Sequence, residues 1–167
     1  MTIRWSDVQG VYSADLQDHW ARSQALGLNC PADVFEQLFH DQHDNVDRAT
    51  VLRFVDWSAV AWEEGELSGV ALRHAGVPRP YQYAIDEARA VTARDGFYDE
   101  RAEVMAHWAT AHTWIRSPIV LAGEVLQALV NYEVIVGFTR LGNLLGALDR
   151  QDLPEWARHR VRIGRLA

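Results

Sequence analysis

A segment near the C-terminal end has residue types and spacing suited to holding a phosphate. Residues 132–136 read Tyr-Glu-Val-Ile-Val, Gly137 follows, and Thr139 and Arg140 open a leucine-containing stretch that ends at Leu148. The β-branched residues predict a strand, and the leucine spacing predicts a helix over 139–148. The first amides of a helix lack partners within it, and its dipole favours an anion there. The alternative is an ordinary strand–turn–helix, with Thr139 as a cap and Arg140 in solvent.

Acidic residues near this segment are candidate general bases. Glu133 lies on the expected strand and shares a face with Ile135 and Gly137, since side chains alternate along a strand. We therefore take Glu133 as the candidate catalytic residue, with Glu124 as a second possibility.

His40 and His43 are the pair most similar to a metal site, because residues three apart share a helix face and two imidazoles could chelate a divalent ion. The residues around the two histidines include aspartates but not the glutamate that acts as general base in zinc proteases. We therefore interpret the segment as a polar helix end and predict no metal site.

The single cysteine, Cys30, excludes an internal disulfide and is taken as a small buried apolar group rather than a nucleophile.

The charge of the chain is negative and unevenly distributed. The 167 residues suit one domain, and the net charge is −7 with no lysine. Residues 1–112 hold nine arginines against eighteen acidic residues, whereas residues 113–167 hold seven arginines against five. This balance argues against a nucleic-acid binder and places an anionic ligand in the C-terminal part. The acidic N-terminal part faces either a basic protein partner or solvent.

The first residues of the chain and the length of its apolar runs indicate the cellular compartment. The first residues have no apolar signal core, and no apolar run is long enough to span a bilayer. A lone thiol fits a reducing compartment. We therefore expect a cytoplasmic protein with no membrane partner.

The periodicity predicts an α+β fold, with a small mixed sheet from about residue 112 and a mostly helical portion, residues 1–111, packing on residues 112–167. The segment 51–57 is either a strand or a buried helical turn, and 62–73 is mixed. The expected elements are helices over 13–25, from Pro31, over 80–94 and over 98–107, strands over 117–122 and 132–136, a helix over 139–148, a helical turn over 153–158 and an edge strand over 160–164.

The order of motifs from His112 to Leu148 resembles the ParB/sulfiredoxin superfamily. Its members have a segment ending Pro-Ile-Val, then a spacer, a strand, a Gly-x-x-Arg box and a leucine-rich helix. Here the strand-forming segment is Ser-Pro-Ile-Val-Leu at 117–121, and the box is Gly137-Phe-Thr-Arg140. The resemblance covers about a quarter of the chain and implies a ParB/sulfiredoxin-like fold in which the box lies against nucleotide phosphates.

The resemblance also implies roles for individual residues. Gly137 would permit close approach of a phosphate, Thr139 would cap the helix or donate its hydroxyl, and Arg140 would bind the phosphate. Arg116 would be a second phosphate ligand and Trp114 would stack on a base; the alternative is a core tryptophan and a solvated arginine. Sulfiredoxin's cysteine is missing from the box, so its reductase chemistry is not expected.

Two functions follow from these residues. The first is a nucleoside triphosphate-binding protein that uses Mg²⁺ and hydrolyses the nucleotide or transfers its phosphate. The second is a non-catalytic interaction module, toxin-neutralising or regulatory, that meets a basic partner through an acidic, tryptophan-rich surface. The basic residues from Arg158 to Arg165 allow a third, less favoured interpretation as a nucleic-acid contact.

Overall fold

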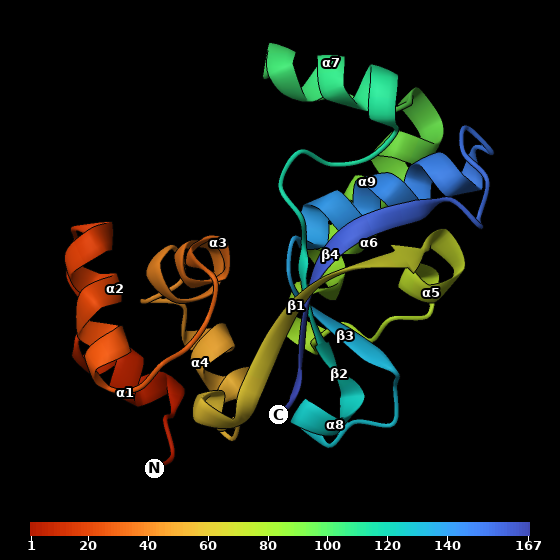
Figure 1. Cartoon of the computed structure of the whole chain (residues 1–167). Coiled ribbons are helices and arrows are strands. Elements are labelled where there is room, and N and C mark those ends of the chain that lie inside the picture. The colour runs from red at the N-terminus through yellow and green to blue at the C-terminus, as the bar shows by residue number, and fades with distance from the viewer.

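The structure is a computed structural model that describes residues 1–167 (Figure 1). It is a mixed α/β fold, which confirms the α+β expectation at that level. The elements are α1 Trp5–Gly10, α2 Leu16–Ala25, α3 Ala32–Val34, the π-helix η1 Phe35–His40, α4 Val46–Leu52, the 3₁₀ turn η2 Trp57–Ala59, β1 Val60–Ser68, α5 Gly69–Arg73, the 3₁₀ turn η3 Arg79–Tyr81, α6 Gln82–Asp95, α7 Ala102–Ala111, β2 Ile119–Ala122, α8 Gly123–Leu126, β3 Tyr132–Val136, α9 Phe138–Asp149 and β4 Arg158–Leu166.

The sheet has four strands in the order β1-β4-β2-β3. β4 runs antiparallel to β1 over nine residue pairs and parallel to β2, whereas β2 and β3 are antiparallel. The strand predicted over 160–164 is present as part of β4, but it is an interior strand, so its predicted position at the edge was wrong. The sheet is also not confined to residues 112–167, because β1 comes from the preceding portion.

Helices cover both faces of the sheet and bury one core on each side. Ile119 and Leu121 of β2 pack with the N-terminal helices, whereas Val120 between them packs with α9. Side chains alternate along a strand, so this one strand joins the two cores. Figure 1 shows α1 to α4 on one side of the strands and α6 and α9 on the other.

Two glycines bring α9 very close to α6. A Cβ atom at Gly142 would lie 2.5 Å from the carbonyl oxygen of Ile85, and one at Gly146 would lie 2.6 Å from that of Arg89. Real Cβ atoms do not approach oxygen so closely, so these positions require glycine. The close packing fixes the position of α9, whose first turn borders the site described below.

Three segments differ from expectation. The ambiguous segment 51–57 is the end of α4, a turn and the start of η2, so the strand alternative is wrong. The mixed region contains β1 instead. Residues 153–157 form turns without a helix before the chain enters β4, so the helical turn predicted there was wrong.

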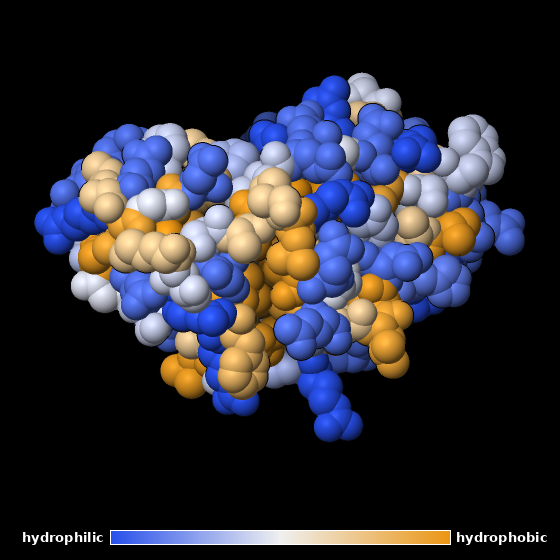
Figure 2. Space-filling view, turned by 60° about the horizontal axis from the view of Figure 1, so that its bottom comes forward, coloured by the Kyte–Doolittle hydropathy of each residue, from blue (hydrophilic) through white to orange (hydrophobic).

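Half-buried and exposed apolar side chains line a hollow on the underside of the molecule. Val51 and Phe54 at the end of α4 face Val125 and Leu126 of α8 across a hollow of about 360 Å³, and Phe54 is 75% exposed. Figure 2 shows apolar atoms collected in this hollow. No helix combines the length and the apolar character that crossing a bilayer requires.

Candidate functional site

A cavity of about 480 Å³ lies where α9 begins. Its walls come from the first two turns of α9, from residues 113–116 before β2, from the loop after α6 and from α7. Helix α7 has no buried residue and stands above the rest of the fold (Figure 1). Four of the predicted site residues line this one cavity: Trp114, Arg116, Thr139 and Arg140.

Gly137 lets the chain turn from β3 into α9. Its φ of +96° is in the left-handed region that favours glycine, and an added Cβ would lie 3.0 Å from Pro118. No side chain caps α9, so Thr139 is not the predicted cap. The first-turn amides therefore keep their hydrogen-bonding capacity for another group. The exposed Thr139 lines the cavity.

Arg140 is half-buried and has no carboxylate partner. Its guanidinium donates to the main-chain carbonyl of Arg116 and, at 3.0 Å, to the Oε1 atom of Gln37. Both acceptors are neutral. Burial, together with the neighbouring charges of Arg116 and Arg101, lowers the pKa of Arg140 to about 10. Because burying a charge without a counterion is costly, this guanidinium is a strong candidate for an anion ligand.

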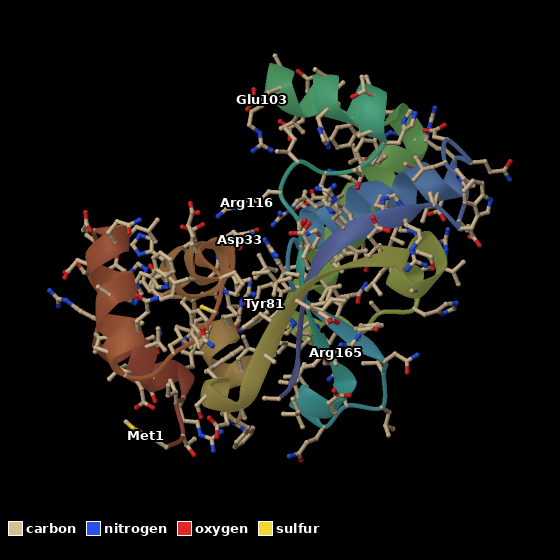
Figure 3. The ribbon with its side chains drawn as sticks, viewed as in Figure 1. Met1, Asp33, Tyr81, Glu103, Arg116 and Arg165 are labelled. Carbon is tan, nitrogen blue, oxygen red and sulfur yellow. The ribbon has the colours of Figure 1, made fainter.

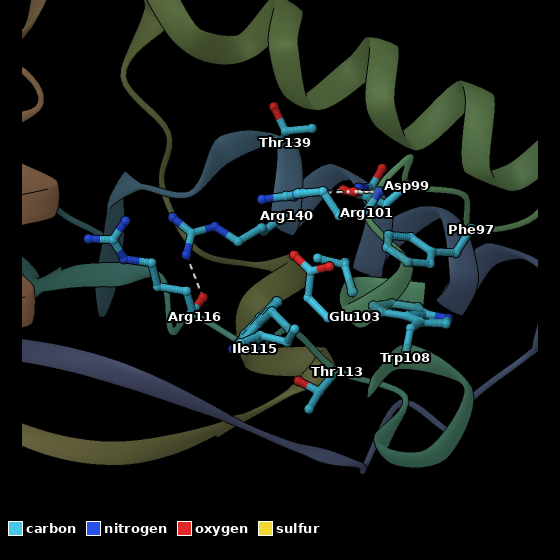
Figure 4. A pocket seen from close by; sticks show the side chains of 13 residues that line it. Phe97, Asp99, Arg101, Glu103, Trp108, Thr113, Ile115, Arg116, Thr139 and Arg140 are labelled. Atoms are coloured by element: carbon cyan, nitrogen blue, oxygen red, sulfur yellow. Dashed lines mark hydrogen bonds and ion pairs between the residues drawn. The ribbon is translucent and has the colours of Figure 1, made fainter. Parts of the chain in front are cut away.

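The other two cavity arginines are already paired. Arg116 lies 2.9 Å from Glu36 on η1, and Arg101 lies 2.7 Å from Asp99 (Figure 4). Arg140 is thus the cavity arginine whose charge the protein leaves uncompensated. Residues 113–116 form a linker between α7 and β2, and Figure 3 shows Arg116 on this linker, below α7.

Gln37 was missed by the sequence reasoning. It is 3% exposed, accepts from Arg140 and lies 3.4 Å from the carbonyl of Ser117. The sequence feature that could have indicated it is the position of this polar residue inside the apolar stripe from Val34 to Phe39. Such residues are buried only when they are hydrogen-bonded, so Gln37 is a positioning residue for Arg140.

The aromatic side chains of the cavity are not those predicted. Trp114 is 6% exposed, and its Nε1 donates to the carbonyl of Arg160 at 2.7 Å, which leaves no open face for a base. It anchors the linker to β4. Phe97 and Trp108 also line the cavity and stack with ring centroids 4.1 Å apart. They are half-buried, so they offer the apolar ring surface that Trp114 lacks.

The structure does not bring Glu133 to this cavity. It lies at the far end of β3 beside Gly76, and Gly137 is four steps of about 3.3 Å further along the chain. Burial raises the pKa of its carboxyl. Glu124 lines a different hollow with Tyr132 and Arg165.

The Nδ1 atoms of His40 and His43 face other groups of the protein. His43 Nδ1 lies 3.0 Å from the carbonyl of His40, and His40 Nδ1 lies 3.1 Å from His19 Nδ1. His19 Nε2 faces the carbonyl of Val8, so it carries the proton and Nδ1 of His19 accepts from His40. No three His, Cys, Asp or Glu side chains are grouped so that they could hold a metal ion.

A buried histidine beside the site predicts loss of stability in acid. His159 is 2% exposed, lies 3.1 Å from the Thr113 hydroxyl, and burial lowers its pKa from 6.5 to about 4. Between these values the unfolded chain binds a proton that the folded chain does not, so stability falls as the pH drops from 6.5 towards 4. We expect His159 to account for roughly 1–2 kcal/mol of this loss. Urea unfolding at pH 7 and pH 4.5 measures it, and an equally steep loss in His159→Phe would contradict the assignment.

Comparisons of the chain with protein-family models, with curated proteins and with solved structures give no match.

Proposed function

We propose that the cavity at the start of α9 binds a nucleoside triphosphate with Mg²⁺, and that the chain is ParB/sulfiredoxin-like. The observation that carries the proposal is the half-buried guanidinium of Arg140, which has two neutral acceptors and no carboxylate partner. A phosphate group would supply the missing negative charge and could also accept hydrogen bonds from the uncapped first turn of α9.

The cavity is open at the place where the phosphate would bind. Phe138, which follows Gly137, turns away and stacks on Tyr81 with ring centroids 4.3 Å apart. It is not among the lining residues, so it does not fill the cavity. The volume suits a small ligand, since such sites range from about 300 to 1,000 Å³. Mg²⁺ would be held mainly by the phosphates. Hydrolysis or phosphate transfer would need a carboxylate other than Glu133.

The alternative of an interaction module has less support. Of the seven tryptophans, only Trp156 is exposed, at 78%, so the chain presents no tryptophan-rich surface.

The nucleic-acid alternative also has less support, because arginines of the segment from Arg158 to Arg165, the basic tail, are paired with carboxylates. Arg162 lies 2.8 Å from Asp33, and Arg165 lies 2.7 Å from Glu63. The tail therefore offers few free charges for a nucleic-acid backbone.

Titration calorimetry with ATP, CTP and GTP, each with Mg²⁺, tests the proposal. We expect saturable heat with one site per chain for at least one nucleotide, and a rise in melting temperature at saturating ligand. Inorganic triphosphate should compete, because the phosphates make the main contact. No heat with any of the three nucleotides would refute the proposal.

A further inference from the structure

The chemistry of the cavity changes along its length. Figure 4 shows the guanidinium groups of Arg140 and Arg116 at one end and the rings of Phe97 and Trp108 at the other. The carboxylate of Glu103, at the start of α7, lies between these ends in that view and points into the cavity. All five residues line the same cavity.

We propose that Glu103 selects ribonucleotides by accepting hydrogen bonds from the 2′ and 3′ hydroxyls of the sugar. This inference rests on the proposed nucleotide binding. A nucleotide has the same order of parts as the cavity: an anionic end, a polar sugar and an aromatic base. With phosphates at Arg140 and the base at Phe97 and Trp108, the sugar lies beside Glu103.

Glu103 has acceptors to offer because no basic group pairs with it. The cavity arginines lie nearby, but Arg101 is bound to Asp99 and Arg116 to Glu36. Glu103 is also in the first turn of α7, where the positive end of the helix dipole attracts a negative charge. An ionised carboxylate only accepts hydrogen bonds, so the ligand group that faces it must be a donor.

The charge of Glu103 also fixes which way the ligand enters. A triphosphate beside this carboxylate would meet a like charge, so the phosphates are directed to the Arg140 end. A pair of neighbouring hydroxyls can donate to both carboxylate oxygens, and carboxylates recognise ribose in this manner in dinucleotide-binding folds. Removal of the 2′ hydroxyl would leave one carboxylate oxygen without its donor.

The test compares ATP with 2′-deoxy-ATP, both with Mg²⁺, by calorimetry on the full chain. We expect the wild-type chain to bind ATP about tenfold more tightly or better, the range for a hydrogen bond to a charged group. Glu103→Ala should bind both nucleotides equally, because the acceptor is gone. Glu87→Gln, a change at an exposed glutamate of α6, is the matched control and should keep the preference.

The outcomes separate this inference from the proposed function. Equal affinity of the wild-type chain for ATP and 2′-deoxy-ATP, or a preference that survives in Glu103→Ala, overturns the role of Glu103 but leaves nucleotide binding intact. Binding of no nucleotide at all overturns both proposals.

Discussion

Arg140→Ala is expected to weaken binding of a nucleoside triphosphate with Mg²⁺ by about 100-fold, the effect typical of truncating one member of a buried charge pair. The physical reason is that Arg140 is the cavity arginine whose charge no carboxylate of the protein balances. Arg116 and Arg101 are held by Glu36 and Asp99, so they cannot replace it without losing those contacts. Titration calorimetry of the variant measures the loss.

The fold of Arg140→Ala should survive. The substitution leaves the Gln37 side chain and the Arg116 carbonyl without a donor, which costs roughly 1–3 kcal/mol, but it also removes a desolvated charge. Circular dichroism should show unchanged helix content. Arg79→Ala is the matched control, because Arg79 is exposed and lies outside the cavity. Equal affinity of Arg140→Ala and Arg79→Ala would show that Arg140 only joins parts of the fold.

Gly146→Ala is expected to lower the free energy of unfolding by about 2 kcal/mol, a typical cost of overpacking a tight contact. The new Cβ would lie 2.6 Å from the carbonyl oxygen of Arg89 and 2.7 Å from the Cβ of Thr92. These are a backbone atom and a rigid side-chain atom, so α6 and α9 must move apart. In a helix alanine is otherwise favoured over glycine by about 1 kcal/mol, so the sign of the change is informative. Urea unfolding should show the midpoint lowered by roughly 1 M.

Gly10→Ala is the control for this change. Gly10 ends helix α1, and an added Cβ would meet nothing within 4 Å. We expect Gly10→Ala to leave stability unchanged or slightly increased. If Gly146→Ala behaved in the same way, the close contact of α6 and α9 would not exist in solution.

The elements with a strong local pattern could be predicted from the sequence. β2, β3 and α9 were expected nearly at their observed bounds, because β-branched runs and leucine spacing reflect local burial. β1 could not be recognised, since it contains three glutamates and Gly65. Its pairing depends on β4, about 100 residues later, where Arg162 lies 3.0 Å from Glu64. That long-range pairing also explains why β4 is interior and not at the edge.

Only one side of the candidate site could be predicted from the sequence. The side of the cavity formed by α9 and the linker was predicted, because Thr139, Arg140 and Arg116 flank recognisable strands. The opposite side was not, because Phe97 and Glu103 lie in segments without a local motif and reach the cavity only through the placement of α7. Glu133 was misplaced because alternation fixes the face of a strand and not the position along it.

The acidic residues of β1 bear on self-association. β1 pairs with β4 on one side only, so its other side presents main-chain groups that a strand from a second molecule could bind. Such a strand, if it were β1 of another copy, would bring two rows of Glu63, Glu64 and Glu66 together. Each of these glutamates is in an ion pair with an arginine of β4, and a second strand would have to desolvate this charged row, which discourages growth of an intermolecular sheet. The same glutamates that hide the strand from sequence-based recognition therefore protect the folded chain from aggregation.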